Sequence, residues 1–226
     1  MFLEILPLAM LGGVLGLDVV SFPQAMISRP LAAATITGAF MGEPLSGLLI
    51  GAALELIALE TLPFGASRYP EWGSAAVVGG ALFASHPAHP AGSMTLAVLC
   101  ALATAWIGGW TMVKLRQQNA RWAGARRSAI DAGARGSVIG LQLLGLTADL
   151  LRGALLTGLV LAVSRPFVDA ALARWSVDAQ IERAIVVAAA ASVMAGAAWK
   201  IFHATSGARW FFLGGLAIGL GILVLR

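Results

Sequence analysis

Hydrophobic residues along this chain gather in uncharged stretches that short polar or charged segments separate. The stretches cover residues 5–17, 31–42, 45–54, 73–85, 91–113, 153–163, 184–199 and 210–225. A helix that crosses a bilayer needs about 20 apolar residues, and several of these stretches are shorter. Short apolar segments interrupted by prolines and charges are typical of broken or re-entrant membrane helices. The pattern predicts an all-α, polytopic membrane protein with broken or re-entrant helices in its N-terminal third.

The longest charged stretch lies in the middle of the chain. Between Lys114 and Arg135 it carries six basic residues and the single acid Asp131. Cytoplasmic loops of membrane proteins are enriched in lysine and arginine. We therefore expect a basic cytoplasmic loop at 114–136. It divides the chain into an N-terminal membrane region with a polar substrate-site segment and a set of C-terminal membrane helices, at 1–113 and 137–226 respectively.

This loop also sets an orientation for the second half of the chain. Segments 91–113 and 184–199 would run inward, and segments 137–163 and 210–225 would run outward. The charges of the connection at 165–183 balance to zero, which fits a loop on the outer side.

Composition agrees with a membrane protein and excludes several other classes. Of the 226 residues 59% are hydrophobic and 12% are charged, whereas a soluble domain carries about 25% charged residues. The net charge of +4 fits basic cytoplasmic loops. The sequence has no basic stripe interleaved with aromatic residues, which argues against nucleic-acid binding. Cys100 is the only cysteine, so an internal disulfide is impossible.

Motifs of soluble enzymes are missing from the sequence. It has no GxSxG nucleophile turn, no phosphate-binding GxxxxGK and no cysteine/histidine metal spacing. We therefore expect no catalytic residue, no metal and no cofactor. His86, His89 and His203 lie outside the polar segment described next, and we assign them to surface or interface positions.

The segment from Asp18 to Glu71 holds the polar groups that are unusual at membrane depth. Pro23 and Pro30 remove backbone donors and disfavour helix at the preceding residue. Unwound backbone inside a membrane is tolerated only where it is buried in protein or lines a cavity. Asp18, Gln24, Ser28 and Arg29 flank this break and could bind a polar solute. An ordinary surface loop is the alternative interpretation.

Acidic residues continue this pattern further along the chain. Glu55 follows an apolar run, and an ionised acid at the centre of a membrane costs about 2.5–3.5 kcal/mol on insertion scales. It therefore either meets a substrate or forms a structural ion pair with Arg29 or Arg68. Glu60 and Arg68 are further candidates for substrate binding, although Glu60 lies nearer the helix end. Glu71 lies in a Gly/Pro-rich turn and is expected to face water.

Asp149 and Arg152 form the one notable charged pair of the second half. They are three residues apart, so they share a helix face and can pair. We interpret them as a structural ion pair or a bend at the membrane surface that faces a partner, in preference to a substrate contact.

An ordered series of residues across 18–76 resembles the IIC subunit of the mannose/sorbose family of bacterial phosphoenolpyruvate-dependent sugar phosphotransferase systems. The series is Gln24, Ser28-Arg29-Pro30-Leu31, Thr35, Gly38, Gly42, Gly47, Ile50-Gly51, Leu54 to Leu59, Phe64-Gly65-Ala66 and Pro70-Glu71. The chain departs from mannose-type members at Glu55, where an amide is frequent, and at Pro63, near a frequent asparagine. These departures leave the identity of the sugar open.

The resemblance implies a sugar-translocating subunit in the bacterial cytoplasmic (inner) membrane. It implies an IID membrane subunit as partner, assembled as an oligomer of IIC–IID pairs, and soluble IIA and IIB phosphocarriers. The chain would bind the sugar and pass it inward for phosphorylation by IIB, without being an enzyme by itself. An ion-coupled secondary transporter with a proton site at Glu55 or Asp18, and a membrane scaffold, are the alternatives.

Overall fold

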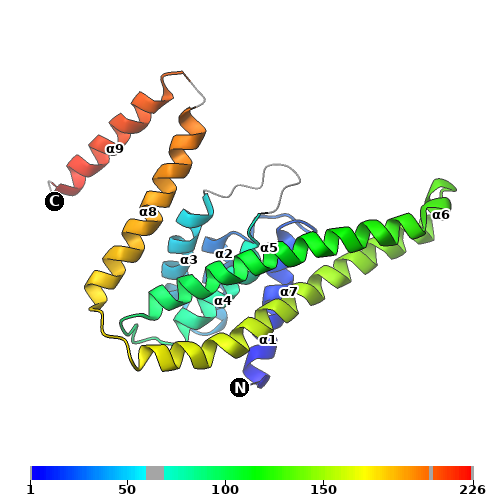
Figure 1. The fold of residues 1–226 in the computed structure, drawn as a ribbon, viewed down its shortest axis with the longest axis horizontal. Helices are drawn as coiled ribbons and strands as arrows, with labels where there is room; N and C mark the ends of the chain where they lie inside the picture. Colours follow the sequence, from blue (N-terminus) through cyan, green and yellow to red (C-terminus); the bar gives the residue numbers. More distant parts are fainter. Residues whose placement is uncertain (1, 60–68, 204–205, 225–226) are drawn as a thin grey trace.

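The computed structural model describes residues 2–59, 69–203 and 206–224, and these residues are organised as helices joined by short connections (Figure 1). The helices are α1 (Phe2–Asp18), α2 (Pro30–Phe40), α3 (Pro44–Ala58), α4 (Trp72–Ala84), α5 (Ser93–Ala125), α6 (Arg127–Asp131), α7 (Arg135–Leu172), α8 (Ala179–His203) and α9 (Ala208–Val224). Proline stands at the start of α2 and of α3, where its missing N–H has no intrahelical partner to lose. The all-α fold class is confirmed.

Helix α4 forms the centre of the molecule. All of its residues are buried, and it packs against α1, α2, α3, α5 and α7. Its sequence of glycine, alanine and valine between Trp72 and Leu82 lets the neighbouring backbones come close. Helices α2 and α3 also lie close together at a glycine, because a side chain at Gly47 would overlap the carbonyl of Ala34. Close packing at glycine is therefore a feature of this N-terminal half.

Within the part of the chain that the structure describes, three helices have the length and composition to cross a membrane, namely the segments Ser93–Ala125, Arg135–Leu172 and Ala179–Trp199. Shorter apolar helices fill the rest of the described chain, among them α2, α3 and α4. Short helices in the N-terminal third confirm the prediction of a membrane protein with broken helices.

The basic stretch at 114–136 is helical, which differs from the loop that we expected. Helix α5 continues to Ala125, α6 occupies the tip, and α7 begins at Arg135, so that α5 and α7 extend side by side away from the core (Figure 1). Lysine, arginine, glutamine and alanine are strong helix formers, and charge alone does not unwind them. Residues 114–136 are called the basic hairpin below.

Helix α7 is also longer than the sequence indicated. It passes through Pro166 and ends at Leu172. The connection to α8 is therefore shorter than the loop at 165–183 that we predicted from the charged residues. Helix α8 packs against α3 and α5, whereas α9 packs mainly against α8. Helix α8 starts against the core, and from there α8 and α9 project outward as an arm (Figure 1). Exposed apolar side chains on this arm include Ile185, Trp210 and Phe211.

Candidate functional site

The backbone between α1 and α2 is unwound, and Asp18 organises it. Its carboxylate oxygens accept hydrogen bonds from Ala25 N at 2.6 Å and from Ser28 N at 2.9 Å. Asp18 itself is buried. A carboxylate that accepts several backbone N–H groups replaces the bonds that the broken helix has lost. Residues 18–30 are called the first wall below.

Two residues of the first wall have a backbone conformation that is rare outside glycine. Gln24 has a φ of 59° and Met26 a φ of 64°. Such conformations cost about 1–3 kcal/mol each and gather at functional sites, where the surrounding structure enforces them. Gln24 also donates from its side-chain Nε2 to the carbonyl of Val20 at 2.7 Å. The first wall is therefore held in a defined shape.

Arg29 and Glu55 form an ion pair beside this wall. The Nε and Nη2 groups of Arg29 both donate to Glu55 Oε1, with Nε at 2.8 Å. The other oxygen, Oε2, accepts from Leu31 N at 3.2 Å at the start of α2. Both charges are thereby paired, and Glu55 fixes the direction of the guanidinium. Of the alternatives for Glu55, the ion pair with Arg29 is the arrangement that the structure contains.

A second segment, residues 69–72, faces the first and is called the second wall. Glu71 N donates to the carbonyl of Ala105 on α5 at 2.9 Å. The second wall lies close against α5 because Gly109 has no side chain, and any Cβ there would overlap the carbonyl of Tyr69. Arg116, from the basic hairpin, donates from Nη2 to the Tyr69 hydroxyl at 2.7 Å and stacks over its ring.

The two walls border a partly open cavity of about 230 Å³. Its lining combines charged and amide groups with aromatic rings, and consists of Asp18, Val19, Gln24, Met26, Ser28, Arg29, Pro30, Tyr69, Pro70 and Trp72. Pockets for small polar ligands are typically lined in this way, with a few hydrogen-bonding groups on an apolar and aromatic background.

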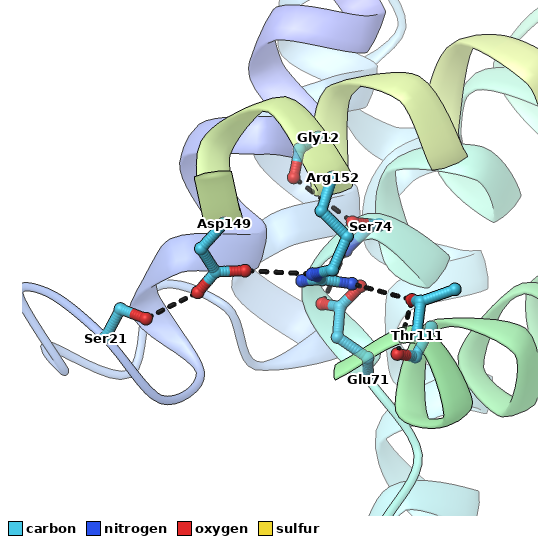
Figure 2. Close-up of polar contacts among 8 residues, drawn as sticks. Gly12, Ser21, Glu71, Ser74, Thr111, Asp149 and Arg152 are labelled. Carbon is cyan, nitrogen blue, oxygen red and sulfur yellow. Dashed lines mark hydrogen bonds and ion pairs between the residues drawn. The ribbon is translucent and has the colours of Figure 1, made fainter. Parts of the chain in front are cut away.

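A buried charge cluster lies behind the second wall (Figure 2). Arg152 Nε donates to Asp149 Oδ1 at 2.9 Å, which confirms the predicted ion pair. Arg152 Nη1 lies 3.9 Å from Glu71 Oε2, and Glu71 Oε1 caps α4 by accepting from Ser74 N at 3.0 Å. Glu71 is 1% exposed, so our expectation that it faces water is wrong. Its role as helix cap and ion-pair partner explains its burial.

The cavity brings together four of the predicted substrate-binding residues, Asp18, Gln24, Ser28 and Arg29. Glu55 is not among the residues that line it, but it is paired with Arg29, which does line it. Glu60 and Arg68 lie outside the described residues. Tyr69 and Trp72 line the cavity but were not among our candidates. The sequence did contain a hint of a binding role for Tyr69, because it is the only tyrosine of the chain and stands beside Pro70.

Two of the three histidines lie at contacts between helices. His86 Nε2 is 3.2 Å from Asp169 Oδ1, and His89 Nε2 is 2.9 Å from the Ser46 hydroxyl. Both are partly exposed and stand away from the cavity described above. These positions agree with surface or interface roles.

Comparison with known proteins identifies the family. A family model described as the sorbose-specific IIC component of a phosphotransferase system (PTS) matches residues 2–218. The chain belongs to this family. It is therefore a membrane component of a sugar phosphotransferase system, of the permease type.

A solved structure supports the fold of this IIC protein. That structure, described only as "Structure of membrane protein", superposes with a TM-score of 0.73 at 19% sequence identity, and the match covers 99% of this chain and 91% of the other. At this identity the likeness concerns the fold alone. No curated protein sequence matches the chain.

Proposed function

We propose that the cavity between the two walls binds the transported sugar, and that the chain carries the sugar across the membrane and passes it to IIB for phosphorylation. The observation that carries this proposal is the unwound first wall, which Asp18 holds open beside Arg29. Unwound backbone at membrane depth is tolerated where it is buried in protein or lines a cavity, and a cavity lined by polar groups suits a polar ligand.

The lining residues suggest how a sugar is held. The guanidinium of Arg29 has five N–H donors. Glu55 accepts from the Nε and Nη2 groups, so the remaining N–H donors can reach sugar hydroxyls. The Gln24 amide can both donate and accept, which suits a hydroxyl. Tyr69 and Trp72 offer apolar ring surface to the C–H side of the sugar. Glu55 is then a positioning residue for Arg29.

The proposed partners follow from the family. IID would complete the membrane part as an oligomer of IIC–IID pairs, and IIA and IIB would carry the phosphate. The bacterial cytoplasmic (inner) membrane is the proposed location, with the basic hairpin on the cytoplasmic side. Exposed apolar side chains such as Trp210 and Phe211 on the α8–α9 arm suit contact with lipid or with a second membrane subunit.

An ion-coupled carrier is less well supported by the same geometry. A proton site would need a carboxylate that is free to exchange a proton during transport. Asp18 already accepts two backbone N–H groups, and Glu55 is paired with Arg29. Neither acid is arranged as a mobile proton carrier.

Uptake by cells tests the proposal. The chain is expressed with candidate IIA, IIB and IID subunits from its own genome in a strain without a mannose-type system, and a panel of radiolabelled hexoses is offered. Gln24→Ala should lower uptake at limiting sugar by about tenfold or more, since it removes a hydrogen bond from the ligand. Gln117→Ala, an exposed amide on the basic hairpin, should leave uptake unchanged. Equal uptake by the parent and by Gln24→Ala, both present in the membrane, would place the sugar elsewhere.

A further inference from the structure

The charge cluster of Glu71, Asp149 and Arg152 is close to the cavity without lining it. Asp149 and Arg152 come from α7, and Glu71 immediately precedes α4. The side chains of Asp149 and Arg152 are 1% and 9% exposed. A buried guanidinium between two carboxylates is costly to place in a membrane protein and usually has a functional reason.

One end of the cluster reaches the first wall. The Ser21 hydroxyl donates to Asp149 Oδ2, while Asp149 Oδ1 accepts from Arg152 (Figure 2). Ser21 lies in the unwound stretch between Asp18 and Gln24, which both line the cavity. The position of the first wall therefore depends on a side chain that α7 contributes.

The other end of the cluster reaches the second wall. Glu71 stands between Pro70 and Trp72, two lining residues of the cavity. Among the described residues, Glu71 Oε2 has no hydrogen-bond donor, and Arg152 Nη1 at 3.9 Å is its counter-charge. Arg152 Nη1 also donates to the Thr111 hydroxyl on α5 at 3.3 Å. Arg152 thus connects both walls to the α5–α7 pair.

We propose that Arg152 is a positioning residue that sets the distance between the two walls and thereby the affinity of the cavity for sugar. This inference rests on the proposed function of the cavity. Without the guanidinium, Asp149 and Glu71 would be two buried carboxylates facing one site, and their repulsion would push the walls apart. Arg116 supports the second wall independently through Tyr69.

A sugar-independent measurement tests the geometric part. In a Cys100→Ser background, a cysteine replaces Val19, which belongs to the first wall and lines the cavity. The labelling rate of this cysteine with a maleimide is measured in membranes. Arg152→Gln should raise this rate by about tenfold, which corresponds to the loss of one charge-assisted hydrogen bond. Arg152→Lys, which keeps the charge, should raise it less. Arg121→Gln, an exposed arginine of the basic hairpin, is the matched control and should not change it.

Ser21→Ala keeps the test decisive if Arg152→Gln does not accumulate in the membrane. It removes only the hydroxyl that joins the first wall to Asp149, and it should raise the labelling rate in the same direction by a smaller factor. If Ser21→Ala and every Arg152 variant that folds were labelled at the same rate as the parent, the inference would be overturned.

Uptake kinetics test the consequence for sugar binding. With a hexose that the parent transports, Arg152→Lys should raise KM by less than about tenfold, and less than Arg152→Gln does, while the maximal rate stays nearly unchanged, because positioning affects binding first. A variant that merely misfolds would lower the maximal rate instead. An unchanged KM despite altered labelling would overturn the role in affinity. Failure of the parent to transport any hexose would count against the proposed function, while the labelling result would stand.

Discussion

At the level of single residues, the cavity depends on side chains that replace missing backbone hydrogen bonds. Asp18 accepts two backbone N–H groups of the first wall, and Glu55 accepts from Leu31 N and from Arg29. The sequence suggested polar residues around Pro23 and Pro30, because prolines and membrane-depth charges are visible in it. It did not reveal that Asp18 would be satisfied by backbone amides, since that requires the left-handed turns at Gln24 and Met26.

Asp18→Asn should destabilise the protein and weaken sugar uptake. An amide has a single acceptor oxygen and no charge, so it cannot accept from both Ala25 N and Ser28 N as the carboxylate does. We expect a loss of about 1.5–3 kcal/mol in the free energy of unfolding. Thermal unfolding in detergent measures this. The matched control is Asp131→Asn at the exposed tip of the basic hairpin, and an equal melting temperature for Asp18→Asn and the parent would refute the assigned role.

At the level of the helices, the sequence predicted the short elements of the first third well, because proline marks where α2 and α3 begin. The buried position of Glu71 could not be predicted in the same way. Its ion-pair partner Arg152 is about eighty residues away in the chain, and only the packing of α7 on α1 and α4 brings them together. The basic hairpin differs from the predicted loop because a high density of charge does not imply irregular backbone.

Limited proteolysis distinguishes a helical basic hairpin from a loop. Trypsin should cut after Arg126 or Arg127 at the tip, where α5 ends and α6 begins, because a protease needs locally extended backbone. Lys114 and Arg116 lie within α5, and Arg116 is bonded to Tyr69, so cleavage there should be slow.

Mass spectrometry of the fragments gives the sites. Cleavage should occur in inside-out vesicles and not from the outer side, if the basic hairpin is cytoplasmic as proposed. Rapid cleavage after Lys114 would show that the end of α5 unwinds, contrary to the helix that the structure contains.

In the molecule as a whole, the cavity stands near the base of the basic hairpin. Arg116 connects the hairpin to Tyr69 in the second wall, and Asp149 and Arg152 connect α7 to both walls. In the proposed orientation the cavity is thus nearer the cytoplasmic side, where IIB would receive the sugar. The α8–α9 arm lies on another side of the core, which leaves it available for lipid or for the proposed partner IID (Figure 1).

The chemical form in which the sugar arrives inside distinguishes the proposed function from ion-coupled transport. Membrane vesicles that contain this chain and its membrane partner are loaded with phosphoenolpyruvate and the soluble phosphocarriers, and a transported hexose is added outside. We predict that the internal sugar is phosphorylated and that uptake stops when phosphoenolpyruvate is omitted. Accumulation of unmodified sugar that persists without phosphoenolpyruvate and collapses with a proton uncoupler would contradict the proposed function.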